Sequence, residues 1–400
     1  MGRINKRALL GRLQRMGTGS RADLAKSLGL SQPTAGKIVD QLLAMEVLEE
    51  VNSLAKPDRR ETSHGRGPAP KLGRPGRLLR LNRTRPRFLG IQLGVSETSL
   101  APLPVGANGE DHWTLRVPTP DTAAEWLRQL RKAAVRIRRD DFWGVLVSVP
   151  GIVDEKAGRV LFSPNLHWTE GTDLPALIRQ VWNAPLFLVQ EERALALGHQ
   201  SVDPSGEDFL LVDFGEGVGG AVVVASKLYA HPLPISGELG HTPVLGNQRP
   251  CGCGAVGCVE TLVSTRGLLQ SLAEAGTEGP HTWPALADWI NQRGVPAWLA
   301  QALDAAAVVI AGALNVLGLR RVVLTGSLAE LPSSVFRYLS GAIVQGAMWG
   351  RFGKVECELA PRRRTAGLVA VGIDRLVIPM AEHERRQETL LHVASTHGSG

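Results

Sequence analysis

Apolar residues near the start of the chain recur at steps of three and four, and this spacing predicts three consecutive helices. The first spans 4–16, with basic residues opposite its apolar face. A second helix is expected to begin after Ser20, with Asp23 completing a capping box, and to end at Gly29. Ser31 is expected to cap the third helix, whose inward positions are Ala35, Ile38, Val39, Leu42 and Met45.

The turn between the second and third predicted helices is short and contains glycine, as in a helix-turn-helix. In that motif the second helix enters the major groove of DNA and reads base edges from its first turns. At these positions the sequence offers Ser31, Gln32, Thr34 and Lys37. A glutamine can pair with adenine through two hydrogen bonds and a threonine can contact the thymine methyl group, so Gln32 and Thr34 are candidate base readers. Any packing unit of three helices would show the same apolar pattern.

Two short strands are predicted after these helices, over 47–51 and 77–81. The stretch between them is basic and rich in Pro and Gly, which is typical of the wing of a winged helix. Within it Arg74 lies between Gly73 and Pro75, so its guanidinium could enter a narrow minor groove of DNA. Arg66 has a similar setting, and for both arginines a plain flexible linker is the alternative interpretation.

From residue 88 the pattern changes to short apolar runs separated by helical segments, which predicts an α/β architecture with buried strands. The predicted strands are 88–91, 144–149, 186–189, 209–212, 221–224 and 321–324. Glycine-bearing turns follow three of them, at 93–96, 213–220 and 325–327. Backbone amides at such turns can approach a phosphate, although a glycine in a turn is more often only a turn residue.

The 400 residues are 44% hydrophobic and 21% charged, which is typical of a globular protein with a sizeable core. The charge is unevenly distributed: residues 1–87 hold 19 Lys and Arg against 7 Asp and Glu, and the remainder holds 26 against 31. A basic head on a mildly acidic body, together with the helix pattern, predicts that the head binds double-stranded DNA. The sequence shows no secretory signal and no long apolar segment, so we expect a cytoplasmic protein without membrane contact.

Three of the four cysteines lie within residues 251–258, and this spacing argues against a disulfide framework. Together with His241, the residues Cys251, Cys253 and Cys258 form the pattern H-x9-C-x-C-x4-C, with glycines between the cysteines that let the loop fold around a metal. Four nitrogen and sulfur ligands describe a tetrahedral Zn²⁺ site without a position for water, so we expect one structural zinc per chain. Reduced cysteines packed as small apolar residues are the alternative.

These motifs, in this order, closely resemble the ROK family of repressors, open reading frames and sugar kinases, and in particular its regulator branch, which includes xylose and N-acetylglucosamine repressors. The resemblance covers nearly the whole chain and rests on the segments 149–151, 163–168, 215–220, 237–241 and 251–260. It implies that a winged helix-turn-helix over 1–87 is followed by an actin-like, two-lobed sugar-kinase fold. The α/β lobes are expected over 88–195 and 196–380, and a partly disordered tail over 381–400.

The resemblance also implies which residues contact a sugar between the two lobes. By analogy these are Asn165, Glu191, Glu238, His241 and Glu260, and His241 doubles as a zinc ligand. If the segment before His241 is helical, Glu238 shares a face with that ligand, and the zinc would hold the helix that offers Glu238 to the cleft. If the family resemblance is set aside, Asn165 is interpreted as a turn residue and these glutamates as surface or capping residues.

A departure from the family pattern argues against catalysis. Kinase members open the body with an Asp-x-Gly-x-Thr phosphate loop, whereas this chain has Gln92-Leu-Gly94-Val-Ser96. A neutral amide cannot hold Mg²⁺ as the carboxylate does. The catalytic Asp of the family is matched by Glu191, whose extra methylene displaces the carboxylate. We therefore expect a degenerate kinase without enzymatic activity.

The leading hypothesis is a transcription regulator, most simply a repressor, that senses a sugar or sugar derivative. It is expected to bind an inverted-repeat operator as a homodimer or larger homo-oligomer, because helix-turn-helix proteins read two half-sites. The alternative is an active ATP-dependent sugar kinase with an accessory DNA-binding head. A regulator with a degenerate pocket that responds to a protein partner is a further possibility.

Overall fold

The computed structural model describes residues 2–51, 77–139, 141–229, 235–276 and 281–381, and they form two compact units. The head unit contains the described residues up to 87 together with 103–107 and 371–381. The body unit contains 88–102 and the described residues of 108–370. The predicted wing with Arg66 and Arg74, and the predicted tail beyond Ala381, lie outside the described residues.

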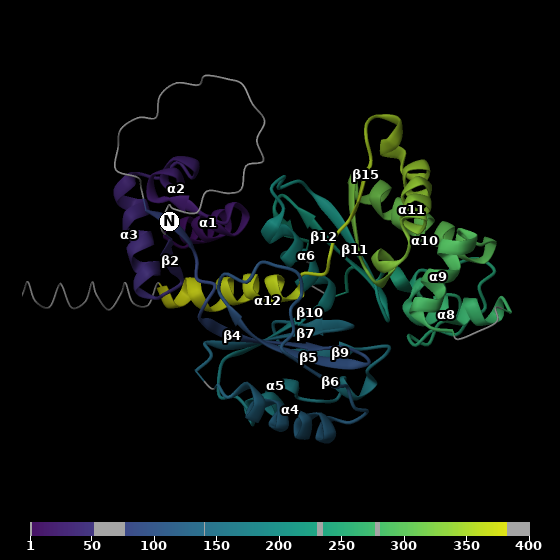
Figure 1. The fold of residues 1–400 in the computed structure, drawn as a ribbon, viewed down its shortest axis with the longest axis horizontal. Coiled ribbons are helices and arrows are strands. Elements are labelled where there is room, and N and C mark those ends of the chain that lie inside the picture. The colour runs from purple at the N-terminus through teal and green to yellow at the C-terminus, as the bar shows by residue number, and fades with distance from the viewer. Residues whose placement is uncertain (1, 52–76, 140, 230–234, 277–280, 382–400) are drawn as a thin grey trace, which may run out of the picture. The chain divides into compact units, whose positions relative to one another are not determined.

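Three helices and a small antiparallel sheet begin the head unit (Figure 1). They are α1 Gly2–Met16, α2 Arg21–Ser27 and α3 Gln32–Ala44, with β1 Gly19–Ser20, β2 Leu48–Val51 and β3 Leu78–Leu81 in the order β1-β3-β2. The capping box of α2 is present, because the Asp23 N–H donates to Ser20 Oγ at 3.1 Å and the Ser20 N–H donates to the Asp23 carboxylate at 3.2 Å. Ser31 caps α3 through the N–H of Thr34. The three predicted helices and the two predicted strands of the head are therefore present.

Residues 371–381 belong to the head unit, although the sequence pattern placed them at the end of the second lobe. They are helical, and Leu376, Val377, Ile378 and Ala381 are at most 8% exposed. An apolar stripe on a helix predicts burial but does not say which domain buries it. The contacts that assign this segment to the head join residues more than 300 positions apart.

The first sheet of the body has the strand order β10-β7-β4-β5-β6. Its strands β4, β7 and β10 run parallel, and α4 and α5 cover one face, where Trp126 and Leu174 are fully buried (Figure 1). A separate hairpin follows β7. The bounds are β4 Pro86–Leu93, β5 Glu97–Pro104, β6 Leu115–Pro118, α4 Ala123–Ile137, β7 Gly144–Val149, β8 Ile152–Asp154, β9 Arg159–Phe162, α5 Leu174–Arg179 and β10 Leu186–Gln190.

The second sheet has the order β13-β12-β11-β14-β15, with β11, β14 and β15 parallel. Alternate residues of β11 enter two cores: Leu210 and Val212 pack with helices α10 and α11, and Phe209 and Leu211 pack with α6. The bounds are α6 Glu191–Val202, β11 Phe209–Phe214, β12 Val218–Val224, β13 Lys227–Leu228, α7 Glu260–Val263, α8 Thr265–Glu274, α9 Trp283–Arg293, α10 Ala297–Leu317, β14 Arg321–Gly326, α11 Ser333–Gly346, β15 Glu356–Leu359 and α12 Arg364–Gly372. All six predicted body strands are present.

By length and hydropathy α10 is the one helix among the described residues that could cross a membrane, and 44% of its most apolar window is buried inside the protein. Residues such as Leu303, Ile310 and Leu314 on this helix are nearly inaccessible and belong to the core of the second lobe. A core helix of a globular domain accounts for the same apolar composition.

A buried histidine at the end of α6 makes the stability of the body depend on pH. His199 lies against the ring of Phe209, with 5.0 Å between centroids, and near Arg321 and Glu358. Burial lowers the pKa of His199 below its usual value of 6.5. Between pH 6.5 and the lowered pKa the unfolded chain binds more protons than the folded one, so the stability that His199 contributes is lost as pH falls through this window.

We therefore expect the thermal midpoint of the wild-type chain to fall as pH is lowered below about 6.5, and His199→Gln to flatten this dependence. Thermal melts in buffers from mildly acidic to mildly alkaline pH would measure it. The exposed His112→Gln serves as the control and should leave the profile unchanged. Identical pH profiles for the wild type and His199→Gln would contradict the prediction.

Candidate functional site

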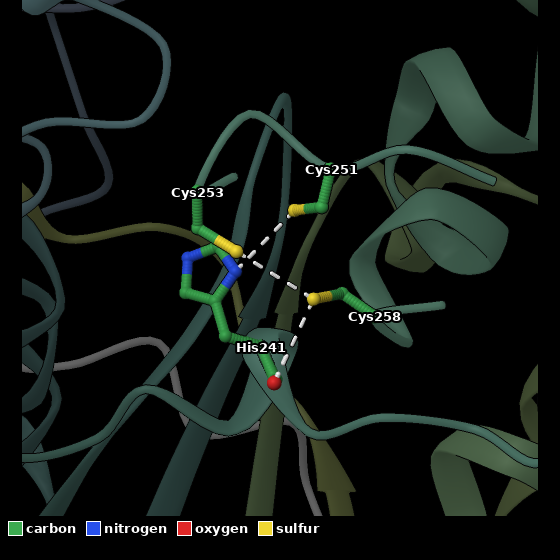
Figure 2. A group of neighbouring side chains, drawn as sticks. All are labelled: His241, Cys251, Cys253 and Cys258. Carbon is green, nitrogen blue, oxygen red and sulfur yellow. Dashed lines mark hydrogen bonds between the residues drawn. The ribbon is translucent and has the colours of Figure 1, made fainter. Parts of the chain in front are cut away.

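One histidine and three cysteines gather in the second lobe and form a candidate metal centre (Figure 2). His241 ends a short 3-10 turn, Leu239–His241, and the cysteines lie on the loop 251–258. Gly254 and Gly257 adopt left-handed backbone angles, with φ of +88° and +85°, which turn the loop back on itself. The ligand atoms of His241, Cys251, Cys253 and Cys258 all lie within 4.8 Å of one another.

The separations of these atoms fit a tetrahedral zinc site. Cys253 Sγ lies 3.7 Å from Cys258 Sγ, and Cys251 Sγ lies 3.5 Å from His241 Nδ1. A tetrahedron with Zn–S bonds of about 2.3 Å and a Zn–N bond of about 2.0 Å has edges of about 3.8 and 3.5 Å. All four cysteines of the chain are free thiols, and burial raises the pKa of Cys258 to about 12. The cluster could therefore bind a metal ion, whose charge would keep the thiolates ionised.

Beside this cluster the body unit contains a cleft, a cavity of about 150 Å³. All three predicted glycine turns contribute to its wall, at Gly94, Gly215 and Ser327. The cavity is smaller than the roughly 300–1,000 Å³ of clefts that hold drug-sized ligands. The side chains that the family resemblance assigned to a sugar line it together: Asn165, Glu191, Glu238, His241 and Glu260.

Glu238 reaches the cleft from a turn. The sequence analysis considered a helix just before His241, and the structure has a short 3-10 turn there instead. It directly precedes the 3-10 turn, and its Oε2 lies 3.9 Å from His241 Nε2, so the expected proximity of the two side chains holds. Gly237 has φ of +87°, and a Cβ at this position would lie 1.8 Å from the carbonyl oxygen of Gly220. Glycine is therefore required for the segment to approach β12 closely enough to present Glu238. Burial raises the pKa of the Glu238 carboxyl.

Glu260 connects the cleft with the metal cluster. It is 5% exposed, its Oε2 accepts a hydrogen bond from the N–H of Val218 at 2.8 Å, and its Oε1 lies 3.9 Å from Cys251 Sγ. Because Glu260 opens α7 directly after the cysteine loop, a metal in that loop would also hold this carboxylate in place.

The cleft is also lined by two arginine side chains that the sequence analysis did not identify, Arg362 and Arg364. Arg362 forms two hydrogen bonds of 2.8 Å with the carboxylate of Asp213. Its guanidinium packs on the glycine turns, because a Cβ on Gly215 would lie 2.6 Å from Arg362 Nη2 and one on Gly326 would lie 2.8 Å away. Although burial opposes its ionisation, the Arg362 charge lowers the pKa of Asp213. The turns predicted to accept a phosphate therefore hold an internal cation.

Arg364, which also lines the cleft, forms ion pairs with further carboxylates. Its side chain is 6% exposed and pairs with Asp111, at 3.2 Å, and with Glu191. Gln92 donates to the same Glu191 at 3.4 Å, so the residue that replaces the kinase aspartate belongs to this network. Burial, together with the Glu191 charge, raises the pKa of the neighbouring Glu192 well above its usual value. The run 362–364 of three arginines in a mildly acidic body was the signal that sequence reasoning could have used.

In the head unit α3 exposes the residues predicted to contact DNA. Gln32, Thr34 and Lys37 are solvent-exposed, and an ion pair of 2.6 Å between Arg21 and Asp40 joins α2 to α3. The Ser31 hydroxyl is occupied by the cap and lies 2.8 Å from the Thr34 hydroxyl. Ser31 therefore orients the start of the helix, whereas Gln32 and Lys37 are open to a ligand.

Comparisons with known proteins agree on one family. The sequence pattern of the ROK family matches residues 88–370. The putative xylose repressor of Caldicellulosiruptor sp. strain Rt8B.4 is 28% identical over 288 residues, which cover 69% of this chain and 68% of that protein. N-acetylmannosamine kinase of Escherichia coli is 29% identical over 180 residues, covering 44% of this chain and 62% of the kinase.

Solved structures share the fold. A ROK family transcriptional regulator described as a homologue of the E. coli MLC protein superposes with a TM-score of 0.69 at 18% identity, covering 95% of this chain and 98% of that chain. A ROK family glucokinase from Streptomyces griseus, solved with glucose and AMPPNP, superposes with a TM-score of 0.58 at 22% identity, covering 71% and 97%. The regulator therefore matches the fold of nearly the whole chain, head and body together. The glucokinase covers a share of the chain that is about as long as the body alone.

Proposed function

The chain belongs to the ROK family, and from that premise we propose that it is a DNA-binding transcriptional repressor whose kinase-like body senses a sugar or sugar derivative. The similarity to xylose repressors supports this function. The observation that carries it is the cleft: it keeps Asn165, Glu238 and Glu260, whereas Arg362, paired with Asp213, lies on the glycine turns where a phosphate was expected. Such a cleft binds a ligand without transferring a phosphate to it.

The kinase alternative requires a nucleotide beside the sugar. With Gln92 in place of a carboxylate, and with Asp213 and the glycine turns occupied by Arg362, the site offers neither the Mg²⁺ ligand of the kinase phosphate loop nor an open phosphate cradle. We expect no ATP turnover with D-xylose, D-glucose, D-fructose or N-acetylmannosamine in a coupled assay, and calorimetric binding of at least one such sugar. ATP-dependent phosphorylation of any of them would establish the kinase, and binding of none would favour a protein effector.

Sequence-specific DNA binding is assigned to α3, with Gln32 and Thr34 on base edges and Lys37 on a phosphate. We expect Gln32→Ala to relax discrimination at one base pair by about 1–3 kcal/mol, and Lys37→Ala to weaken binding to all sequences and lower the salt dependence by about one phosphate contact. Titration of selected and random duplexes at several salt concentrations would separate the two effects. Uniform weakening by Gln32→Ala would remove it from the base-reading set.

The DNA-binding head is proposed to act in a homodimer on an inverted repeat. The second lobe offers a surface for a second copy: Leu245, Val308, Val316, Trp349 and Phe352 are between 42% and 103% exposed, on or beside α10 and α11. Exposed apolar side chains of this kind are typical of homodimer interfaces. Light scattering should give twice the chain mass at micromolar concentration, and a monomer on DNA would contradict this assignment.

The metal centre is proposed to hold one structural zinc. All four ligand positions are protein atoms, so the ion would have no open site and would act by holding the cysteine loop, the turn before His241 and the start of α7 together. We also propose that the protein is cytoplasmic, where thiols remain reduced and available to the metal.

A further inference from the structure

The last described helix changes its hydrogen-bonding pattern along its length. α12 continues directly into a π-helical turn, Ile373–Val377, and then as helix to Ala381. The N–H of Ile378 donates to the carbonyl of Ile373, five residues earlier. Pro379 follows, which provides no backbone donor and crowds the carbonyl four residues before it. A π turn absorbs such a defect, and single π turns recur at functional sites.

The end of this helix is held inside the head unit by α1 and α3. Lys6 of α1 is 0% exposed, and its Nζ donates to the carbonyl oxygen of Ala381 at 2.7 Å. Gln41 of α3 donates to the same carbonyl, and Arg7 of α1 pairs with Asp374 of the π turn. A buried ammonium is costly unless it is paired with a polar group, and the backbone carbonyl oxygen of Ala381 is such a partner. The Ala381 carbonyl therefore joins this helix to the proposed recognition helix.

The same helix begins among the residues of the cleft. Arg364, its first residue, pairs with Asp111 and Glu191, and the Thr365 N–H donates to Asp111 at 2.9 Å. Glu191 is also a proposed effector contact. A ligand hydroxyl that donates to Glu191 competes with Arg364 for this carboxylate, so effector binding changes what holds the first turn of the helix.

We propose that the continuous helix 364–381 transmits the effector response to α3, with Ile373–Val377 as its hinge and the Lys6–Ala381 contact as its attachment. The inference rests on the proposed repressor function. Coupling of this kind requires that a change at Glu191 alters the free energy of DNA binding only while the attachment is intact. Lys6 is then a positioning residue, because it acts on DNA through the helix and not by touching it.

A double-mutant cycle on the full chain tests the coupling without an effector. Glu191→Gln weakens one ion pair at the start of the helix, and Lys6→Met combined with Gln41→Leu removes both side-chain donors to the Ala381 carbonyl. The probe is a duplex that the wild-type chain selects from random sequences, and the readout is its dissociation constant. We expect Glu191→Gln to change the affinity about fivefold in the wild-type background and less than about 1.5-fold in the Lys6→Met/Gln41→Leu background.

Two further variants keep the test decisive. Lys26→Met removes one exposed positive charge from α2 and should leave the effect of Glu191→Gln intact. If the variant that lacks the attachment does not fold, Pro379→Ala replaces it in the test. This substitution restores a backbone donor just after the π turn and should also weaken the coupling. In hydrogen exchange, Glu191→Gln should accelerate the amides of 373–381. If the effects of the substitutions on the dissociation constant were additive, and hydrogen exchange at 373–381 were unchanged, the inference would be wrong but the DNA-binding function would stand. If the wild-type chain selected no duplex from random sequences, the DNA-binding function itself would be wrong.

Discussion

Cys258→Ser is expected to abolish metal binding and to lower the free energy of unfolding by at least about 4 kcal/mol. Cys258 is 1% exposed, and its Sγ lies 3.7 Å from that of Cys253. Metal binding and folding are linked, because the unfolded chain does not present a preformed site and the binding free energy therefore adds to stability. Elemental analysis should give one zinc per wild-type chain and none for the variant, and denaturant titration would give the stability difference.

Cys357 provides the matched control for this substitution. It is the fourth free cysteine, lies on β15 outside the cluster, and is partly buried. Cys357→Ser should retain the metal and lose far less stability than Cys258→Ser. Wild-type protein without metal, or a metal-free Cys258→Ser chain of full stability, would disprove the zinc centre.

Arg364→Ala is expected to destabilise the body unit by about 3–5 kcal/mol, because it leaves buried carboxylates without their cation. Its guanidinium pairs with Asp111 and Glu191, whose side chains are 13% and 15% exposed. A buried ion pair adds little to stability relative to an apolar pair, but removal of one partner exposes the full desolvation cost of the other. Denaturant unfolding at neutral pH would measure the loss.

Arg363→Ala removes the neighbouring arginine and is the control for the Arg364 prediction. Arg363 has one long contact, 3.5 Å to the Asn108 carbonyl, and should cost less than about 1 kcal/mol. Equal stability of the two variants at neutral pH would show that the cleft network is not buried in solution.

The Cys258→Ser and Arg364→Ala predictions both concern the contacts that hold the side chains of the cleft in place. On the proposed assignments, the metal loop holds Glu260 and His241, Arg364 holds the effector contact Glu191, and Arg362 holds Asp213 beside the glycine turns. In a working kinase such turns would face a nucleotide and its Mg²⁺. Here guanidinium groups supply the positive charge from within the chain.

The sequence by itself determined the elements whose causes are local. The capping box at Ser20, the three helix stripes, the six body strands and the cluster of His241 with three cysteines all depend on residue types a few positions apart, and the structure contains each of them. Local hydrogen bonds, side-chain periodicity and loop glycines act over such spacings, so the pattern can be read without the fold. The proximity of Glu238 and His241 was predictable for the same reason, although their turn is 3-10.

Only the tertiary structure decided which distant residues share the cleft and which unit buries the C-terminal helix. Arg362 meets Asp213 across 149 positions, and Lys6 meets Ala381 across 375. No local propensity specifies such partners, because a guanidinium or an ammonium forms equally good contacts with any carboxylate or carbonyl that the fold brings to it. The sequence analysis therefore did not identify these arginines, and the fold places Arg362 on the glycine turns where a phosphate was expected.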